Sequence, residues 1–113
     1  MKLDKLASEI GAKTLAGGDR EVKRVFAGDR VSDILAHAAP EMLVVTNLTG
    51  VQLVRVAGIM DVAGLCLLNG AEPEAPLVQS AAAQGTGVLV SPAGMFETCG
   101  RIHRLLGEEA CSR

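Results

Sequence analysis

The stretch Met42-Leu43-Val44-Val45-Thr46 decides the fold, and it runs directly into the turn Asn47-Leu48-Thr49-Gly50. Its side chains are apolar without alternation, which indicates a strand that is buried on both faces. Similar short apolar runs return at residues 64–68 and 87–90, each followed by small polar or turn-forming residues. The intervals between these runs have the length of short helices. Strands that alternate with helices in this way predict a parallel sheet with right-handed crossovers.

The pattern extends toward both ends of the chain. Further strands are expected at residues 13–16 and 22–27, before the first buried run. Ser32 and Ser91 are predicted to be N-caps of the helices that follow them. The predicted helices span residues 2–10, 33–38, 51–60, 76–85 and 92–106. The fold class that follows is α/β: a single three-layer domain with a mostly parallel sheet and helices on both faces.

Length and composition support one globular domain. The chain has 113 residues, of which 49% are hydrophobic and 21% are charged. A folded chain of this size buries roughly 65% of the surface that its unfolded form exposes, which is enough for a core without disulfides or metals. Disordered and fibrous proteins are therefore excluded. We expect the domain to span residues 1–107 and residues 108–113 to form a frayed tail.

The charge balance argues against nucleic acid and membranes as partners. Lys and Arg number 11 and Asp and Glu number 13, so a net charge of -2 provides no overall positive field for phosphate backbones or anionic lipid. The N-terminus carries charges where a secretory signal needs an unbroken apolar core, and no stretch stays apolar for the length of a membrane span. A cytoplasmic protein is therefore expected, with Cys66, Cys99 and Cys111 as reduced thiols.

Short polar side chains follow the predicted strands at their carboxyl ends, where open parallel sheets bind ligands. Helix N-termini at this edge would also offer backbone N–H groups to an anion. The same residue types are ordinary in caps and turns, so a purely structural role is the alternative interpretation. The candidate ligand-binding residues are Asp29, Ser32, Thr46, Asn47, Thr49, Gly50, Asn69, Gly70 and Ser91.

The sequence contains no pattern that identifies a catalytic, metal or cofactor site. Gly11-Ala12-Lys13-Thr14 lacks the glycine spacing and the strand-to-helix setting of a phosphate-binding loop, which argues against kinase chemistry. Cys99 and His103 share a helix face without a third metal ligand, so a buried thiol and a helix-terminal histidine are the preferred interpretation. Ser91 does not lie in a Gly-x-Ser-x-Gly elbow. We therefore expect no enzyme activity, no metal and no cofactor.

Several motifs carry a family resemblance. They are Gly28-Asp29 with Ser32-Asp33-Ile34-Leu35, Leu43-Val44-Val45-Thr46 before Asn47-Leu48-Thr49-Gly50-Val51, the segment from Leu67 to Pro73, and Ser91 with the Phe96-Glu97 helix. With these motifs the chain resembles a small stand-alone DRTGG domain over nearly its whole length, to about Leu106. The signature loop keeps Thr49-Gly50, has Asn47-Leu48 where the family has Asp-Arg, and has Val51 in place of the last Gly.

The resemblance implies a regulatory role. DRTGG domains occur beside CBS domains in regulated inorganic pyrophosphatases and before the catalytic part of some phosphotransacetylases, as regulatory and dimerising modules without chemistry of their own. Stand-alone members also resemble the N-terminal part of the kinase/phosphorylase that acts on the HPr phosphocarrier, whose P-loop domain this chain lacks. A serine-kinase name for such a chain would be inherited from that longer enzyme.

Two functional hypotheses follow. The first is a non-catalytic homodimer that docks on or modulates a metabolic enzyme. The predicted helix over residues 51–60 is apolar nearly all round, so a partner subunit would cover the side that does not face the sheet. The alternative is a sensor that binds a nucleotide or another phosphorylated metabolite at the strand ends.

Overall fold

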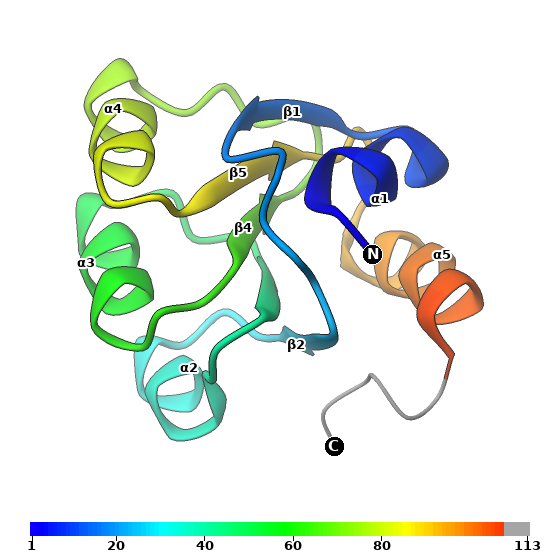
Figure 1. The fold of residues 1–113 in the computed structure, drawn as a ribbon, viewed down its shortest axis with the longest axis horizontal. Helices are drawn as coiled ribbons and strands as arrows, with labels where there is room; N and C mark the ends of the chain where they lie inside the picture. The colour runs from blue at the N-terminus through cyan, green and yellow to red at the C-terminus, as the bar shows by residue number, and fades with distance from the viewer. Residues whose placement is uncertain (108–113) are drawn as a thin grey trace.

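A computed structural model describes residues 1–107 as a five-stranded sheet between two layers of helices (Figure 1). The strands are β1 (Lys13–Ala16), β2 (Arg24–Ala27), β3 (Met42–Thr46), β4 (Gly64–Leu67) and β5 (Gly87–Val90). The helices are α1 (Leu3–Ile10), α2 (Val31–His37), α3 (Val51–Ile59), α4 (Ala75–Ala83) and α5 (Met95–Leu106). The predicted three-layer α/β architecture is confirmed. Residues 108–113, expected to form a frayed tail, lie outside the described residues.

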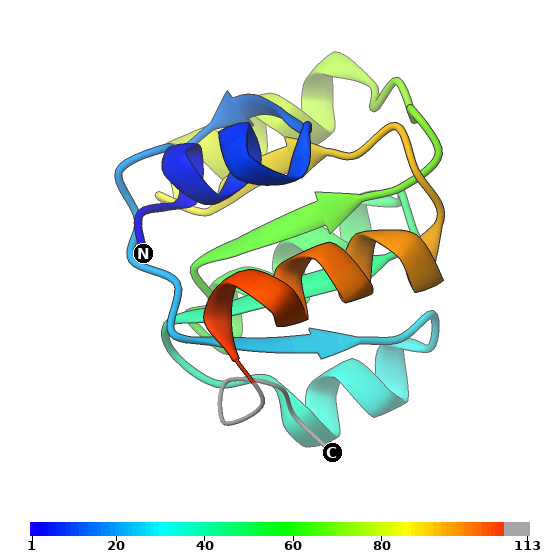
Figure 2. The same ribbon diagram turned by 90° about the vertical axis from the view of Figure 1, so that its right-hand side faces the viewer.

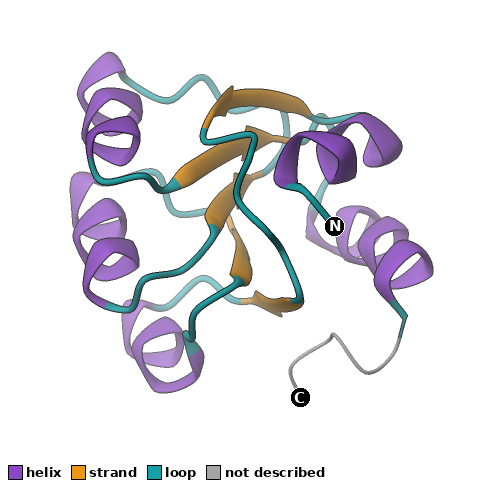
Figure 3. Ribbon diagram, viewed as in Figure 1, coloured by secondary structure: helices purple, strands orange, loops and turns teal. Residues whose placement is uncertain are grey.

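The strand order is β1-β5-β4-β3-β2. Strands β2 to β5 are parallel, and β2, β3 and β4 each pair with the strand that follows in the chain. Strand β1 pairs with β5 in the antiparallel direction and forms one edge, so the sheet is mostly parallel, as predicted. Because right-handed crossovers in one direction stay on one face, α2, α3 and α4 share a face, while α1 and α5 cover the other (Figures 2 and 3).

Every residue of β3, β4 and β5 is buried, which is why these strands read as unbroken apolar runs. Their side chains alternate between two apolar clusters. Val44 and Leu65 belong to the cluster beneath α2, α3 and α4, whereas Leu43 and Leu89 belong to the cluster beneath α1 and α5. Both layers of helices are therefore needed to cover the sheet.

The predicted start of the second helix is wrong by two residues. Helix α2 begins at Val31 with Arg30 as its N-cap, so Ser32 lies inside the first turn instead of before it. The Arg30 carbonyl accepts hydrogen bonds from the N–H groups of Asp33 at 3.1 Å and Ile34 at 3.0 Å. The helix therefore starts directly after the turn that ends β2, and Ser32 is an exposed helical residue.

The predicted start of the last helix is also wrong. Helix α5 begins at Met95 with Gly94 as its N-cap, so Ser91 does not cap a helix. The N–H of Ser91 donates to the Leu67 carbonyl at 2.8 Å, which continues the pairing of β5 with β4 by one residue. Backbone that is still paired with the sheet cannot begin a helix, and Pro92 consequently lies in the connecting loop.

Strand β2 is shorter than predicted at its start. Its pairing with β3 begins at Arg24 opposite Met42, so residues 22 and 23 precede the strand. The N–H of Val22 donates instead to the Met1 carbonyl at 2.8 Å, which holds the N-terminus beside this segment. Val22 is therefore apolar because its side chain is buried in the core, although its backbone does not take part in the pairing of β2 with β3.

Candidate functional site

The polar residues at the carboxyl ends of β2, β3 and β4 form one hydrogen-bonded network. The Asp29 carboxylate accepts the backbone N–H of Asn47 at 2.7 Å and the Asn47 side-chain amide at 2.9 Å. The Thr46 hydroxyl donates to the same carboxylate at 3.3 Å. The Asn69 amide then donates to the side-chain oxygen of Asn47 at 3.2 Å. Four of the predicted site residues are therefore brought together, as expected from parallel strands.

These hydrogen bonds hold the pKa of the Asp29 carboxyl below its usual value. The backbone N–H of Asn47 is the main cause, and the side-chain amide of Asn47 is the next. Partial desolvation opposes the shift, and the Thr46 hydroxyl adds to it. Because donors that favour the charged form stabilise it, Asp29 is an ionised acceptor that ties the end of β2 to the end of β3.

Asn69 and Gly70 connect this network to β5. Both have a positive φ, of 57° and 64°, and the N–H of Ala71 donates to the Leu68 carbonyl at 3.1 Å to close the turn. Consecutive positive φ values are typical of type I′ turns, which favour Asn-Gly. The N–H of Gly70 then donates to the Ser91 carbonyl at 2.8 Å. The turn after β4 is therefore fastened to the end of β5.

Ser91 is buried and its side chain serves the fold. Its hydroxyl and the Thr98 hydroxyl are hydrogen-bonded at 2.8 Å, and the N–H of Ala93 donates to the Ser91 hydroxyl at 3.2 Å. These bonds join the end of β5 to the first turns of α5. Ser91 therefore has its hydrogen-bonding groups engaged within the domain and is fully buried.

Three predicted site residues lie outside the network. Ser32 is exposed on α2. Thr49 and Gly50 line a hollow of about 480 Å³ in front of α3, which they share with residues 71–74. The nine residues are therefore divided among the network and its turn, buried Ser91, an exposed helix and a hollow, and their role in binding a ligand stays a prediction.

A larger pocket of about 540 Å³ opens where the connections after β4 and β5 diverge. The chain passes from β4 to α4 on one face of the sheet and from β5 to α5 on the other (Figure 2). Such a divergence at the carboxyl edge is the usual ligand site of open α/β sheets. The volume is within the range of small-molecule pockets.

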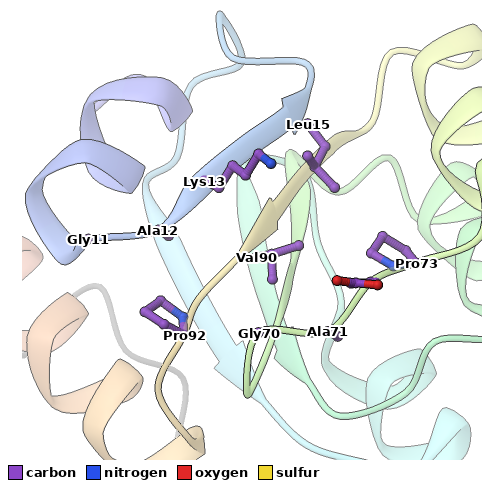
Figure 4. Close-up of a pocket in the computed structure, with 10 residues that line it drawn as sticks. Gly11, Ala12, Lys13, Leu15, Gly70, Ala71, Pro73, Val90 and Pro92 are labelled. Carbon is purple, nitrogen blue, oxygen red and sulfur yellow. The ribbon is translucent and has the colours of Figure 1, made fainter.

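The walls of this pocket come from three segments, as Figure 4 shows. Strand β1 contributes Lys13 and Leu15, β5 contributes Val90, and the loop after β4 contributes Glu72 and Pro73. The walls therefore combine apolar surface with one positive and one negative side chain. Of the predicted site residues, only Gly70 lines this pocket.

Sequence reasoning missed the pocket because its position depends on β1. The segment that contains Lys13 is recognisable as a short strand, but no local signal places it antiparallel beside β5. Once β1 lies there, its first residues meet the end of β5, because antiparallel neighbours run in opposite directions. The signal that was available is Ala71-Glu72-Pro73, a charged loop between a strand and a helix.

The thiols and histidines do not assemble into a site within residues 1–107. Burial raises the pKa of the Cys66 thiol to about 12, and the neighbouring Cys99 thiol contributes to the same shift. Cys99 packs against the apolar cluster beneath α1 and α5, whereas His103 is exposed. His37, at the end of α2, stacks on Phe26 with 4.7 Å between ring centroids. No group of three metal-ligating side chains occurs among the described residues.

Among residues 1–107, no helix has both the length and the apolar character that crossing a membrane requires.

Comparisons with known proteins agree with this fold. The DRTGG domain family model matches residues 5–105. No curated protein matches the chain.

A solved structure with this fold contains the CBS and DRTGG domains of the regulatory region of Clostridium perfringens pyrophosphatase, complexed with the activator diadenosine tetraphosphate. The two folds superpose with a TM-score of 0.71 at 13% sequence identity, over 89% of this chain and 45% of that one. The present chain thus corresponds to less than half of that regulatory region, and the likeness is one of fold. Because the family model matches nearly the whole described structure, the chain belongs to the DRTGG domain family.

Proposed function

We propose that this chain is a cytoplasmic regulatory domain without chemistry of its own, which acts as a homodimer and modulates a metabolic enzyme. The observation that supports this proposal most directly is the closed network at the strand ends. Asp29, Asn47 and Asn69 bond one another and organise the loops, instead of presenting free groups to a substrate. Membership of the DRTGG family supports the regulatory part, since the similar solved structure is the regulatory region of a pyrophosphatase.

Sedimentation velocity on the purified full chain tests the homodimer. We expect one species with twice the mass of the 11.7 kDa chain at micromolar concentrations. A monomer over the whole accessible concentration range would overturn the homodimer. The absence of chemistry is tested separately with radiolabelled ATP and HPr, where we expect no phosphate transfer. Turnover that survives further purification and is abolished by heat would overturn the non-catalytic role.

A second candidate function is a sensor for a nucleotide or another phosphorylated metabolite. The specific observation in its favour is the pocket of about 540 Å³ at the diverging connections. Lys13 would face the phosphate, and the apolar surface of Leu15, Pro73 and Val90 would face the base or carbon skeleton. The solved DRTGG structure was determined with a nucleotide activator, which makes nucleotides the first compounds to try.

Thermal unfolding followed by circular dichroism tests the sensor. A ligand at one hundred times its dissociation constant adds about 2.7 kcal/mol to the free energy of unfolding, which shifts the Tm of a domain this size by several degrees. The Lys13→Ala variant should lose most of that shift, while Lys5→Ala, at an exposed position of α1, should keep it. A panel of nucleotides and phosphorylated metabolites that produces no shift would reject the sensor and leave the homodimer untouched.

A further inference from the structure

Phe96 is the most exposed large apolar side chain in the described residues. Its relative exposure is 95%, and it lies in the first turn of α5. The inner side of this helix is formed by buried Thr98 and Ile102, which contact the core. The only other aromatic side chain, Phe26, packs against the core instead. Phe96 therefore serves no packing role within residues 1–107.

Gly100 lies one turn after Phe96 on the same outer face, since residues four apart in a helix are neighbours. A methyl group added at Gly100 would meet no atom within 4 Å, so the folded chain does not require a glycine there. Glycine is nevertheless among the least favourable residues in a helix interior. On the outer face of α5, the projecting Phe96 side chain therefore lies next to the space left by the missing side chain at Gly100.

The gap and its surroundings form a surface depression of about 460 Å³. It is lined by Phe96, Glu97, Gly100, Arg101 and Arg104, all from α5. The surface therefore has a projecting ring and a hollow side by side on one helix. A surface of this kind can complement a copy of itself across a two-fold axis.

We propose that two copies of this chain associate through α5, with the helices antiparallel and Phe96 of each copy seated over Gly100 of the other. A two-fold axis perpendicular to the helices, near residue 98, places position 96 opposite position 100 in both directions. The absence of a side chain at Gly100 lets the second helix approach closely. This inference rests on the proposed homodimer and specifies which surface forms it.

The charges beside the apolar stripe favour the same arrangement. Glu97 and Arg101 lie four apart on one flank and form an ion pair of 2.7 Å within the helix. In the antiparallel dimer this flank meets itself with the direction reversed, so Glu97 of one copy faces Arg101 of the other. In a parallel pairing the two-fold axis runs along the helices, so the flank with Glu97 and Arg101 meets the opposite flank of the second copy and these two charges do not pair across the interface. Charge complementarity therefore selects a second copy in the antiparallel direction.

The outer side of α3, which the apolar sequence of residues 51–60 predicted to be covered by a partner subunit, is a less suitable surface for a two-fold contact. Helix α3 exposes Val51 and Ile59, but Arg55 lies between them on the same face. A two-fold axis at the middle of this stripe would bring the two Arg55 side chains together without an acid to separate them. This surface supplies the matched control.

Sedimentation equilibrium of three variants of the full chain tests the interface. Phe96→Glu should be monomeric where the unaltered chain is dimeric. Gly100→Leu should raise the dimer dissociation constant at least tenfold, although it suits the isolated helix better. The control Ile59→Glu, at a side chain with 71% exposure on α3, should leave that constant unchanged. Circular dichroism establishes that each variant is folded, so a loss of dimer is not a loss of structure.

Charge reversal tests the antiparallel register. Glu97→Arg should weaken the dimer, and adding Arg101→Glu should restore it, since each acid then faces a base again. The inference is overturned if the α5 variants remain dimeric, or if Ile59→Glu dissociates the dimer and Phe96→Glu does not. In those cases the homodimer stands on another surface. If the unaltered chain is monomeric, the homodimer of the proposed function is lost as well.

Discussion

Asp29 at the end of β2 and Asn47 at the end of β3 are joined by two hydrogen bonds, one of 2.7 Å from the backbone N–H and one of 2.9 Å from the side-chain amide. The carboxylate is thus held by both donors of one residue on the neighbouring strand. Because parallel strands end at the same edge, a single aspartate can fasten two successive strand-to-helix connections. The Asn of this chain occupies the first position of the loop that is Asp-Arg-Thr-Gly-Gly elsewhere in the family, and here it serves as a donor.

This relationship predicts a stability that depends on pH through Asp29. The pKa of Asp29 is lower in the folded chain than its ordinary value of 3.8, so its contribution is complete above that value and is lost as the pH falls through the folded pKa. Asp29→Asn should lower the free energy of unfolding at neutral pH by about 1 kcal/mol, because solvent weakens these partly exposed bonds. It should also flatten the dependence on pH below about 4.

Urea titrations at a series of pH values, followed by circular dichroism, measure this effect. Asp19→Asn is the control, since Asp19 is an exposed residue of the turn after β1. If both variants retained the slope of the unaltered chain below pH 4, Asp29 would not be the responsible group.

Much of the fold could be predicted because strands that are buried on both faces consist of unbroken runs of apolar residues. The bounds of β3 and β5 follow from unbroken apolar runs between turn residues, and the structure confirms both. The helix starts at Ser32 and Ser91 could not be predicted reliably, because a serine suits an N-cap, a first turn and a strand end equally well. The Ser91 hydroxyl is engaged by Thr98, a partner seven residues away that only the tertiary fold supplies.

The candidate site also has a part that could be predicted from the sequence and a part that could not. The strand-end residues could be predicted to meet, since that depends only on parallel strands and their turns. Lys13 could not be predicted to line the pocket of about 540 Å³, because its position depends on the antiparallel pairing of β1 with β5. Strand β1 contacts α1 and α4 as well as β5, and no local pattern in the sequence predicts these contacts.

Gly70 and Gly50 provide a second prediction about the strand-end loops. Gly70 has a φ of 64°, whereas the φ of Gly50 is -79°, and a methyl group at either would meet nothing within 4 Å. Gly70→Ala should therefore cost about 1 kcal/mol of unfolding free energy from backbone strain alone. Gly50→Ala should be neutral or slightly stabilising, because the unfolded chain loses freedom.

Denaturant unfolding of the two variants under identical conditions makes the comparison. Equal losses at both positions would show that the turn after β4 does not require a left-handed residue. A loss confined to Gly70 would agree with the turn formed by Asn69 and Gly70.

The reactivity of Cys66 gives a third prediction. Burial raises the pKa of its thiol to about 12, so roughly one molecule in ten thousand carries the thiolate at pH 8. A variant with Cys99→Ser and Cys111→Ser isolates this thiol. We expect its reaction with a disulfide reagent to be very slow in the folded state and rapid in denaturant.

The matched variant with Cys66→Ser and Cys111→Ser isolates Cys99, which is partly exposed on α5. The absorbance of the thiol that the disulfide reagent releases measures the rate of reaction of Cys66 in one variant and of Cys99 in the other. Labelling of Cys66 in buffer at the rate seen in denaturant would contradict its burial beneath α5.

The last prediction concerns the seat of α1 on the sheet. Gly64 of β4 and Gly87 of β5 are paired side by side, and a methyl group at either would lie 2.5 Å or 2.6 Å from the Cδ1 atom of Leu3. Leu3 is fully buried, so the two glycines form the floor on which α1 rests. Gly64→Ala should cost about 1–3 kcal/mol of unfolding free energy through overpacking, and Leu3→Ala about 2–5 kcal/mol through the cavity that it leaves.

The double variant should lose less than the sum of the two single losses, because the added methyl group enters the space that Leu3 vacates. A double-mutant cycle by urea unfolding measures this coupling, and Leu3→Ala combined with Gly50→Ala, at the opposite edge of the sheet, should be additive. Additive losses for Leu3 and Gly64 would mean that α1 is seated by other contacts.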